Sequence, residues 1–213
     1  MRYLCTFLAF LLLTACNDTK TPVNEETENQ APQPSTETTA PDRSFQTLSP
    51  LSPAELKPYP FEGEVVTQKR WRDAQGEQTA LLTRNEKELF VYHYRRDEAG
   101  VRLVQSTTDH VKDCTDDITL AFLDDAIAVT DVDNDRVGEL TFAYETACRT
   151  DVSPVNLHVV LWVDGKSYYV QGYNTLELGD QRLAEGRRVE DNLSEASPAW
   201  RAQLDRTWQA IVE

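Results

Sequence analysis

The residues of this sequence that are best suited to chemistry are the acidic side chains of the segment TDVDNDRVGEL. Asp131, Asp133 and Asp135 stand at alternate positions, and Glu139 follows four residues after the last of them. A hard cation such as calcium takes about six to eight oxygen ligands. Alternate carboxylates on a tightly curled loop converge on one point, where the backbone carbonyl of Val137 completes the set. The segment therefore predicts a structural calcium site made by these five residues.

This segment departs from the EF-hand calcium loop at two positions. Arg136 stands where the sharp turn prefers glycine, and Phe142 stands where the last glutamate binds the ion through both oxygens. The pattern is closer to strand-loop-strand calcium loops of the form DxDxDGxxD, with Glu139 in the last place. Without a cation, three aspartates so close together would repel one another, which favours metal binding. The alternative is an acidic hairpin turn that stays solvated.

The remaining polar residues do not form a recognisable catalytic motif. No GxSxG, HExxH or glycine-rich phosphate loop accompanies His93, His110 or His158. We therefore expect no catalytic residues. The alternative is a carbohydrate-active enzyme, which needs two carboxylates that flank its substrate. Such a pair stays open among the acidic residues Asp109, Asp113, Asp116, Asp117 and Asp151.

The start of the chain predicts export and a lipid anchor. Arg2 precedes an apolar run from Tyr3 to Leu13, which is shorter than the roughly 20 residues of a membrane span. The tetrapeptide LTAC follows, and it resembles the lipobox of bacterial lipoproteins. In that motif the cysteine, here Cys16, receives a diacylglyceryl group on sulfur, and its amine is acylated after cleavage. Residues 1–15 are thus expected to be a signal peptide, with an ordinary, non-lipoprotein signal as the alternative.

A tether is expected to join the lipidated cysteine to one globular domain. The segment that ends at Ser44 contains no aromatic residue after the anchor, and it is rich in proline, threonine and glutamate. We therefore predict a disordered tether over residues 16–58. The remainder, residues 59–213, is long enough for one domain with its own core.

The charge of the chain limits its partners. The formal net charge is −15, and removal of the signal peptide takes away only one basic residue. Nucleic acid and anionic lipid surfaces would be repelled, whereas cations and basic protein surfaces would be attracted. The alternative is that the charge serves solubility alone.

Two cysteines lie in the predicted domain, Cys114 and Cys148. An exported protein meets oxidising conditions, under which two lone thiols usually form a disulfide. A metal site or a catalytic cysteine is the alternative, but neither a CxxC pair nor a nearby histidine supports a thiol metal site. We predict a disulfide that closes a loop around the acidic segment.

Hydrophobic residues alternate along much of the predicted domain, which favours β-strands. Asp164-Gly165 is a pair that two-residue hairpins prefer, because both turn positions need positive φ. The spacing predicts a mainly β (α+β) domain, an antiparallel meander or sandwich. The strands are expected at Val65–Trp71, Thr79–Thr83, Leu89–Tyr94, Val101–Gln105, Ile118–Phe122, Ala126–Thr130, Leu140–Thr146, Leu157–Val163 and Tyr168–Val170.

The chain ends in a predicted helix. Ser197 is suited to cap it and Pro198 to occupy its first position. The apolar residues Trp200, Leu204 and Trp208 then recur at helical spacing, together with Ile211. We expect this face to pack on the sheet as part of the core.

Several of these segments together resemble a family of bacterial envelope lipoproteins associated with surface-polysaccharide biosynthesis. The resemblance covers roughly Trp71 to Asn174 and rests on the order of WRDAQGEQTALLT, FVYHY, DHVKDCTDDI, VTDVDNDRVGEL and FAYETACRTDVSP. It implies a location and a general process, without a mechanism. It also implies that the cysteine pair and the acidic segment are shared features of one domain.

The function we expect is a non-catalytic binding or accessory role at the envelope, with surface-polysaccharide biosynthesis or assembly as the process. The outer membrane, on its periplasmic or surface face, is the expected location, because Asn17 replaces the aspartate that retains lipoproteins at the inner membrane. Asp18 argues in the other direction. The second hypothesis is an envelope immunity or inhibitor protein whose negative charge meets a basic toxin or hydrolase.

Overall fold

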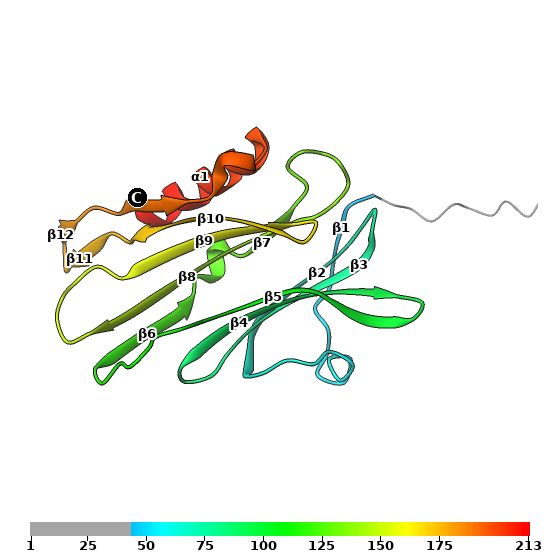
Figure 1. The fold of residues 1–213 in the computed structure, drawn as a ribbon, viewed down its shortest axis with the longest axis horizontal. Helices are drawn as coiled ribbons and strands as arrows, with labels where there is room; N and C mark the ends of the chain where they lie inside the picture. Colours follow the sequence, from blue (N-terminus) through cyan, green and yellow to red (C-terminus); the bar gives the residue numbers. More distant parts are fainter. Residues whose placement is uncertain (1–43) are drawn as a thin grey trace, which may run out of the picture. The chain divides into compact units, whose positions relative to one another are not determined.

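The computed structural model describes residues 44–213, which fold into antiparallel strands followed by one α-helix (Figure 1). This confirms the mainly β fold that the sequence predicts. The signal peptide, Cys16 and most of the predicted tether lie outside the described residues. Within residues 44–213, no helix has the length and apolar character needed to cross a membrane.

The first sheet is a meander of five strands, each antiparallel to the next. Its two edges are formed by β1 and β5. The register shifts once between β2 and β3 and once between β4 and β5. The strands are β1 (Gln46–Leu48), β2 (Glu64–Asp73), β3 (Gly76–Arg84), β4 (Glu88–Asp97) and β5 (Gly100–His110).

The second sheet has the strand order β13-β10-β9-β8-β6, and the short β7 also pairs with β8. Two further strands, β11 and β12, form a separate hairpin between β10 and β13. The elements are β6 (Asp117–Phe122), the 3-10 turn η1 (Asp124–Ala126), β7 (Ala128–Thr130), β8 (Glu139–Arg149), β9 (Asn156–Val163), β10 (Lys166–Tyr173), β11 (Leu176–Leu178), β12 (Gln181–Ala184) and β13 (Arg187–Asp191).

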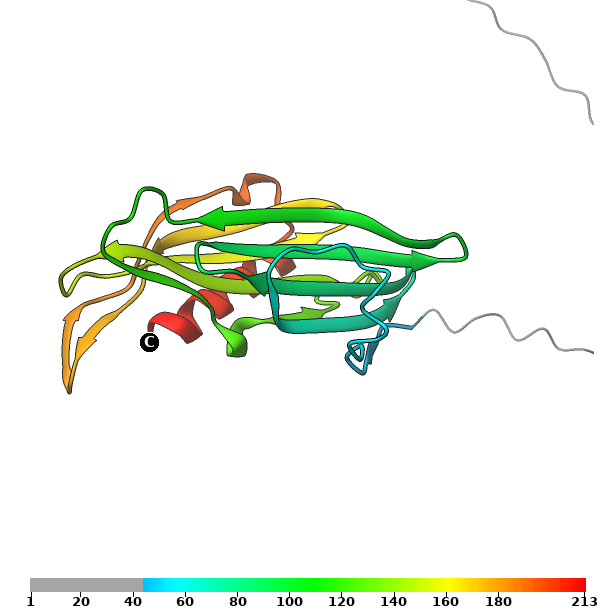
Figure 2. The ribbon, with the colours of Figure 1, turned by 90° about the horizontal axis from the view of Figure 1, so that it is seen from below.

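The two sheets pack face to face, and the helix covers the other side of the second sheet (Figures 1 and 2). Trp71 and Leu82 of the first sheet meet Phe142 and Trp162 of the second in the main core. Alternation along each strand produces this core, because every second side chain points to the same face.

The C-terminal helix α1 (Pro198–Val212) follows a short 3-10 turn, η2 (Leu193–Glu195), and begins as predicted. The Ser197 Oγ accepts a hydrogen bond from the Trp200 backbone N–H at 3.2 Å, and proline occupies the first turn. Leu204 and Trp208 are buried against the apolar face of β9 and β10. The helix therefore covers the outer face of the second sheet.

The hairpin between β9 and β10 has the predicted turn. Asp164 and Gly165 have φ values of 46° and 74°, and Val163 pairs with Lys166 across the turn. Positive φ at both central residues is what a two-residue hairpin loop of this type needs.

The folded unit starts before the boundary predicted at residue 59. Residues Gln46–Leu48 pair with β2, although the sequence predicted a tether there. Leu51 and Tyr59 are buried with Leu81 and Tyr94 on the outer face of the first sheet. The prediction was wrong for this part of the segment, because its few apolar side chains cover the outer face of the first sheet and so fold with it.

The predicted disulfide is present. Cys114 and Cys148 are bonded, with their Cα atoms 5.6 Å apart. The bond joins the segment before β6 to the end of β8, the strand that pairs with β6. The closed loop contains η1, β7 and the whole acidic segment.

Candidate metal site in the acidic loop

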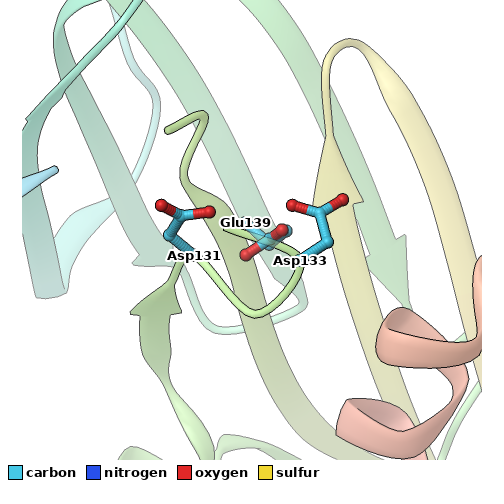
Figure 3. Close-up of side chains that lie close together, drawn as sticks. All are labelled: Asp131, Asp133 and Glu139. Atoms are coloured by element: carbon cyan, nitrogen blue, oxygen red, sulfur yellow. The ribbon is translucent and has the colours of Figure 1, made fainter. Parts of the chain in front are cut away.

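Three of the predicted carboxylates come together in the loop between β7 and β8. Asp131, Asp133 and Glu139 each offer one oxygen, and these oxygens all lie within 4.8 Å of one another (Figure 3). Calcium binds oxygens at about 2.3–2.6 Å, so two ligands on opposite sides of one ion are about 5 Å apart. The three oxygens are therefore close enough to bind the same cation.

The loop is curled by two residues with left-handed backbone conformations. Asn134 has a φ of 59° and Arg136 a φ of 70°. The positive φ at Arg136 is the backbone feature for which glycine is preferred in calcium loops. The Arg136 backbone N–H donates to the Asp131 carboxylate at 3.2 Å, which brings the two ends of the curl together.

Glu139 closes the site from the interior of the protein. This side chain is fully buried at the start of β8. Its Oε2 accepts a hydrogen bond from the Val132 N–H at 3.0 Å, and its Oε1 accepts one from the Trp200 indole N–H at 3.3 Å. Burial raises the pKa of Glu139 to about 7, because a charged carboxylate is poorly solvated there.

Asp135 is the predicted carboxylate ligand that lies outside the group of three carboxylates, and its role as a ligand stays a prediction. Its Oδ1 accepts a hydrogen bond from the Val137 N–H at 2.7 Å, which shapes the end of the curl. Burial raises its pKa, and the charges of Asp133 and Asp131 add to the effect. The Val137 carbonyl stays a predicted ligand.

The acidic charge of the group has no basic partner among residues 44–213. The ion pairs of this part of the chain involve Glu77, Glu177 and Asp205, and none reaches Asp131, Asp133 or Glu139. Close carboxylates repel one another unless a cation or a proton lies between them. The donor set of carboxylate oxygens suits a hard cation such as calcium.

Asp73 anchors the loop to the first sheet, a role that its local sequence does not predict. This residue ends β2 and is 3% exposed. Its Oδ2 accepts hydrogen bonds from the Gly138 N–H at 3.2 Å and from the Trp71 indole N–H at 2.9 Å. The Ala74 N–H also donates to the Arg136 carbonyl at 2.8 Å. The only sequence signal for Asp73 is an acidic residue just before a turn.

Gly138 makes this close approach feasible. A Cβ atom at this position would lie 2.5 Å from the Trp71 Nε1. The backbone can therefore reach Asp73 only without a side chain. The second missed residue is Trp200, which the helical spacing predicted as a core residue and which also donates to Glu139.

The other residues considered for catalysis are scattered. Asp113, Asp116, Asp117 and Asp151 are exposed. Asp109 instead accepts a hydrogen bond from the Tyr144 hydroxyl at 2.9 Å. His110 is exposed, His158 stacks on Tyr144, and His93 is buried beside Trp71.

Comparison of the chain with protein-family models, with curated proteins and with solved structures finds no match.

Proposed function

We propose that this protein is a lipid-anchored, non-catalytic binding module of the bacterial cell envelope whose acidic loop holds a structural calcium ion. The lipobox at Cys16 supports the anchor. The resemblance to envelope lipoproteins supports a role in surface-polysaccharide biosynthesis or assembly. Calcium would order the acidic loop and, through it, the junction of both sheets and the helix.

The observation that carries the proposal is the position of Glu139. A fully buried carboxylate lies beside Asp131 and Asp133 and is held in place by Trp200 of the helix. Burial of a charged group without a compensating charge is unfavourable. A divalent cation supplies that charge and binds all three residues at once.

Terbium luminescence tests this site directly, because terbium binds to calcium sites and is excited by a nearby indole. The full chain, purified in detergent, is titrated with terbium while its tryptophans are excited. We expect saturable emission that excess calcium removes. The Trp200 indole donates to a proposed ligand, so the excitation source is in place.

Two matched variants make the test specific. Asp131→Asn with Asp133→Asn removes two proposed ligands, and we expect it to abolish the emission. Asp124→Asn with Asp125→Asn removes the same charge from exposed positions in η1 and should leave it unchanged. Equal emission from both variants would contradict the proposal.

A further inference from the structure

A second candidate region lies along the edge where β5 faces the second sheet. Two adjoining cavities of about 290 and 170 Å³ open there, and both are lined by His158 and Gln171. In Figure 2, the green β5 and the yellow to orange β10 and β13 lie along the same edge of the sandwich. We call this the lateral groove, and its main lining residues are Thr107, Asp109, Tyr144, His158, Tyr169 and Gln171.

Strand geometry brings polar and aromatic groups to the same face of this groove. Tyr169, Gln171 and Tyr173 stand at alternate positions of β10, so they point to one side of the sheet. The opposite face of β10 is apolar and carries Tyr168 and Val170, which pack under the helix. The groove face is thus the side of β10 that the helix leaves uncovered.

The polar groups of the groove form a connected network. Gln171 donates to Glu190 at 2.9 Å, and the Tyr169 hydroxyl donates to the same carboxylate at 2.7 Å. Gln171 stands opposite His158 in the pairing of β10 with β9, and the His158 Nε2 lies 3.4 Å from the Thr146 hydroxyl. The groove therefore presents fixed donors and acceptors side by side.

The combination of hydrogen-bond donors and acceptors in the groove indicates which class of ligand fits it. A sugar hydroxyl both donates and accepts, as the groove groups do. A purely apolar ligand would instead remove these groups from water without replacing their hydrogen bonds, which costs about 1–3 kcal/mol for each. Tyr169 is half-buried, packs on the main core and lines the groove, so its ring would offer an apolar surface for the C–H groups of a pyranose ring. Small-ligand pockets commonly combine aromatic walls with a few such polar groups.

The charges that line the groove are unfavourable for an anionic occupant, and the nearest recorded cation is the Arg187 guanidinium, 5.0 Å from the centre of the Tyr173 ring. Among the described residues that line the groove there is no lysine or arginine, and Asp109 is the one acidic residue. Glu190 lies beside the groove as a second negative charge. Asp109 accepts from the Tyr144 hydroxyl at 2.9 Å and from the His110 N–H at 2.7 Å, so each of its oxygens already has a partner within the protein.

From these observations we propose that the lateral groove binds a neutral carbohydrate of one or two sugar rings. The proposal rests on the proposed function and deepens it, because it names the class of ligand that the binding module recognises. Gln171 and His158 would hydrogen-bond the hydroxyl groups, and Tyr169 would pack against the ring.

The test uses the full chain in detergent and isothermal titration with defined tetrasaccharides. The neutral probes are maltotetraose, cellotetraose and N-acetylchitotetraose, and tetragalacturonate is the anionic probe. We expect at least one neutral probe to bind and the anionic probe not to bind. Failure of all three neutral probes, or tighter binding of tetragalacturonate, would overturn the proposal.

Substitutions then locate the binding. Gln171→Ala should weaken the affinity for the neutral probe by about tenfold or more. Gln181→Ala on the exposed β12 is the matched control and should have no effect. Tyr169→Phe keeps the ring and should bind, whereas Tyr169→Ala should not. Because the two Tyr169 variants differ in the ring, unchanged binding by Tyr169→Ala with a normal melting curve would also overturn the proposal.

Failure of this proposal can be distinguished from failure of the calcium site. A protein that gives calcium-sensitive terbium emission but binds no neutral tetrasaccharide retains the metal site and lacks the carbohydrate site. A protein that binds the sugar but gives no calcium-sensitive terbium emission has the carbohydrate site and lacks the metal site.

Discussion

Asp73 joins the acidic loop to the first sheet. Its carboxylate accepts four hydrogen bonds, which involve both the acidic loop and its own turn. Oδ2 accepts from Trp71 and Gly138, and Oδ1 accepts from the Gln75 N–H and the Gln78 amide. Such a buried carboxylate stabilises the fold only while its partners stay in place.

Asp73→Asn should therefore lower the free energy of unfolding by about 2–4 kcal/mol, because an amide offers one acceptor oxygen where the carboxylate offers two. Urea unfolding measures the loss. Asp97→Asn is the matched control, since Asp97 ends β4 and accepts one hydrogen bond from the Ala99 N–H at an exposed turn. If both variants lost the same stability, Asp73 would have no special role in joining the sheets.

His93 gives the domain a predictable dependence on acid. It is 8% exposed, its ring stacks on Trp71, and its Nε2 lies 3.0 Å from the Gln78 amide oxygen. Burial lowers the pKa of His93 from 6.5 to about 4 in the folded protein. The neutral ring therefore contributes stability that is fully present above pH 6.5, and this stability is lost as the pH falls from 6.5 towards about 4.

Between pH 6.5 and pH 5, this one group should remove about 1.6 kcal/mol from the free energy of unfolding. His93→Gln cannot be protonated, so it should lose correspondingly less stability over the same interval. Urea unfolding at the two pH values, with chelator present, compares the proteins. An equal loss in both would show that His93 does not titrate in the unfolding transition.

At this scale the sequence predicts a residue well when its partners are close along the chain. Asp131, Asp133 and Glu139 lie within one short segment, and their alternation alone indicated a common site. Asp73 and Trp200 act on the same loop from β2 and from the helix. Their role depends on tertiary packing, which local spacing does not encode.

Among the elements, the strands with alternating apolar residues were predictable, whereas the short edge strands β1 and β13 were not. Leu157–Val163 and the turn after it follow the predicted pattern. β13 is exposed at all five positions, so its sequence contains no alternation to detect. β1 lies in a proline-rich segment and is specified by its pairing with β2.

The disulfide should stabilise the element that carries the acidic loop. Cys114 and Cys148 are 34 residues apart, and closure of such a loop contributes about 3–4 kcal/mol in the chain-entropy model. Cys114→Ser with Cys148→Ser should lower the free energy of unfolding by about this amount. Urea unfolding of the oxidised parent, the reduced parent and the variant measures it. A reduced parent as stable as the oxidised one would contradict the prediction.

For the whole molecule, the sequence predicts that attachment to the membrane depends on one atom, the Cys16 sulfur. Cys16→Ser replaces the thiol that forms the thioether, so the chain should lose its lipid and leave the membrane fraction. Membrane fractionation with labelled palmitate measures both effects, and Cys5→Ser within the signal peptide is the control. Continued membrane association of the unlabelled Cys16→Ser chain would contradict the lipid anchor.

The binding of calcium would link all parts of the domain, because the acidic loop contacts the first sheet through Asp73 and the helix through Trp200. A ligand that binds only the native state stabilises it by about 2.7 kcal/mol at 100 times its dissociation constant.

The most direct test of this account is thermal unfolding of the full chain in detergent, with calcium and with chelator. We predict that calcium raises the midpoint in the parent and in Asp124→Asn with Asp125→Asn, and does not raise it in Asp131→Asn with Asp133→Asn. A parent midpoint that is the same with calcium and with chelator would contradict the calcium site.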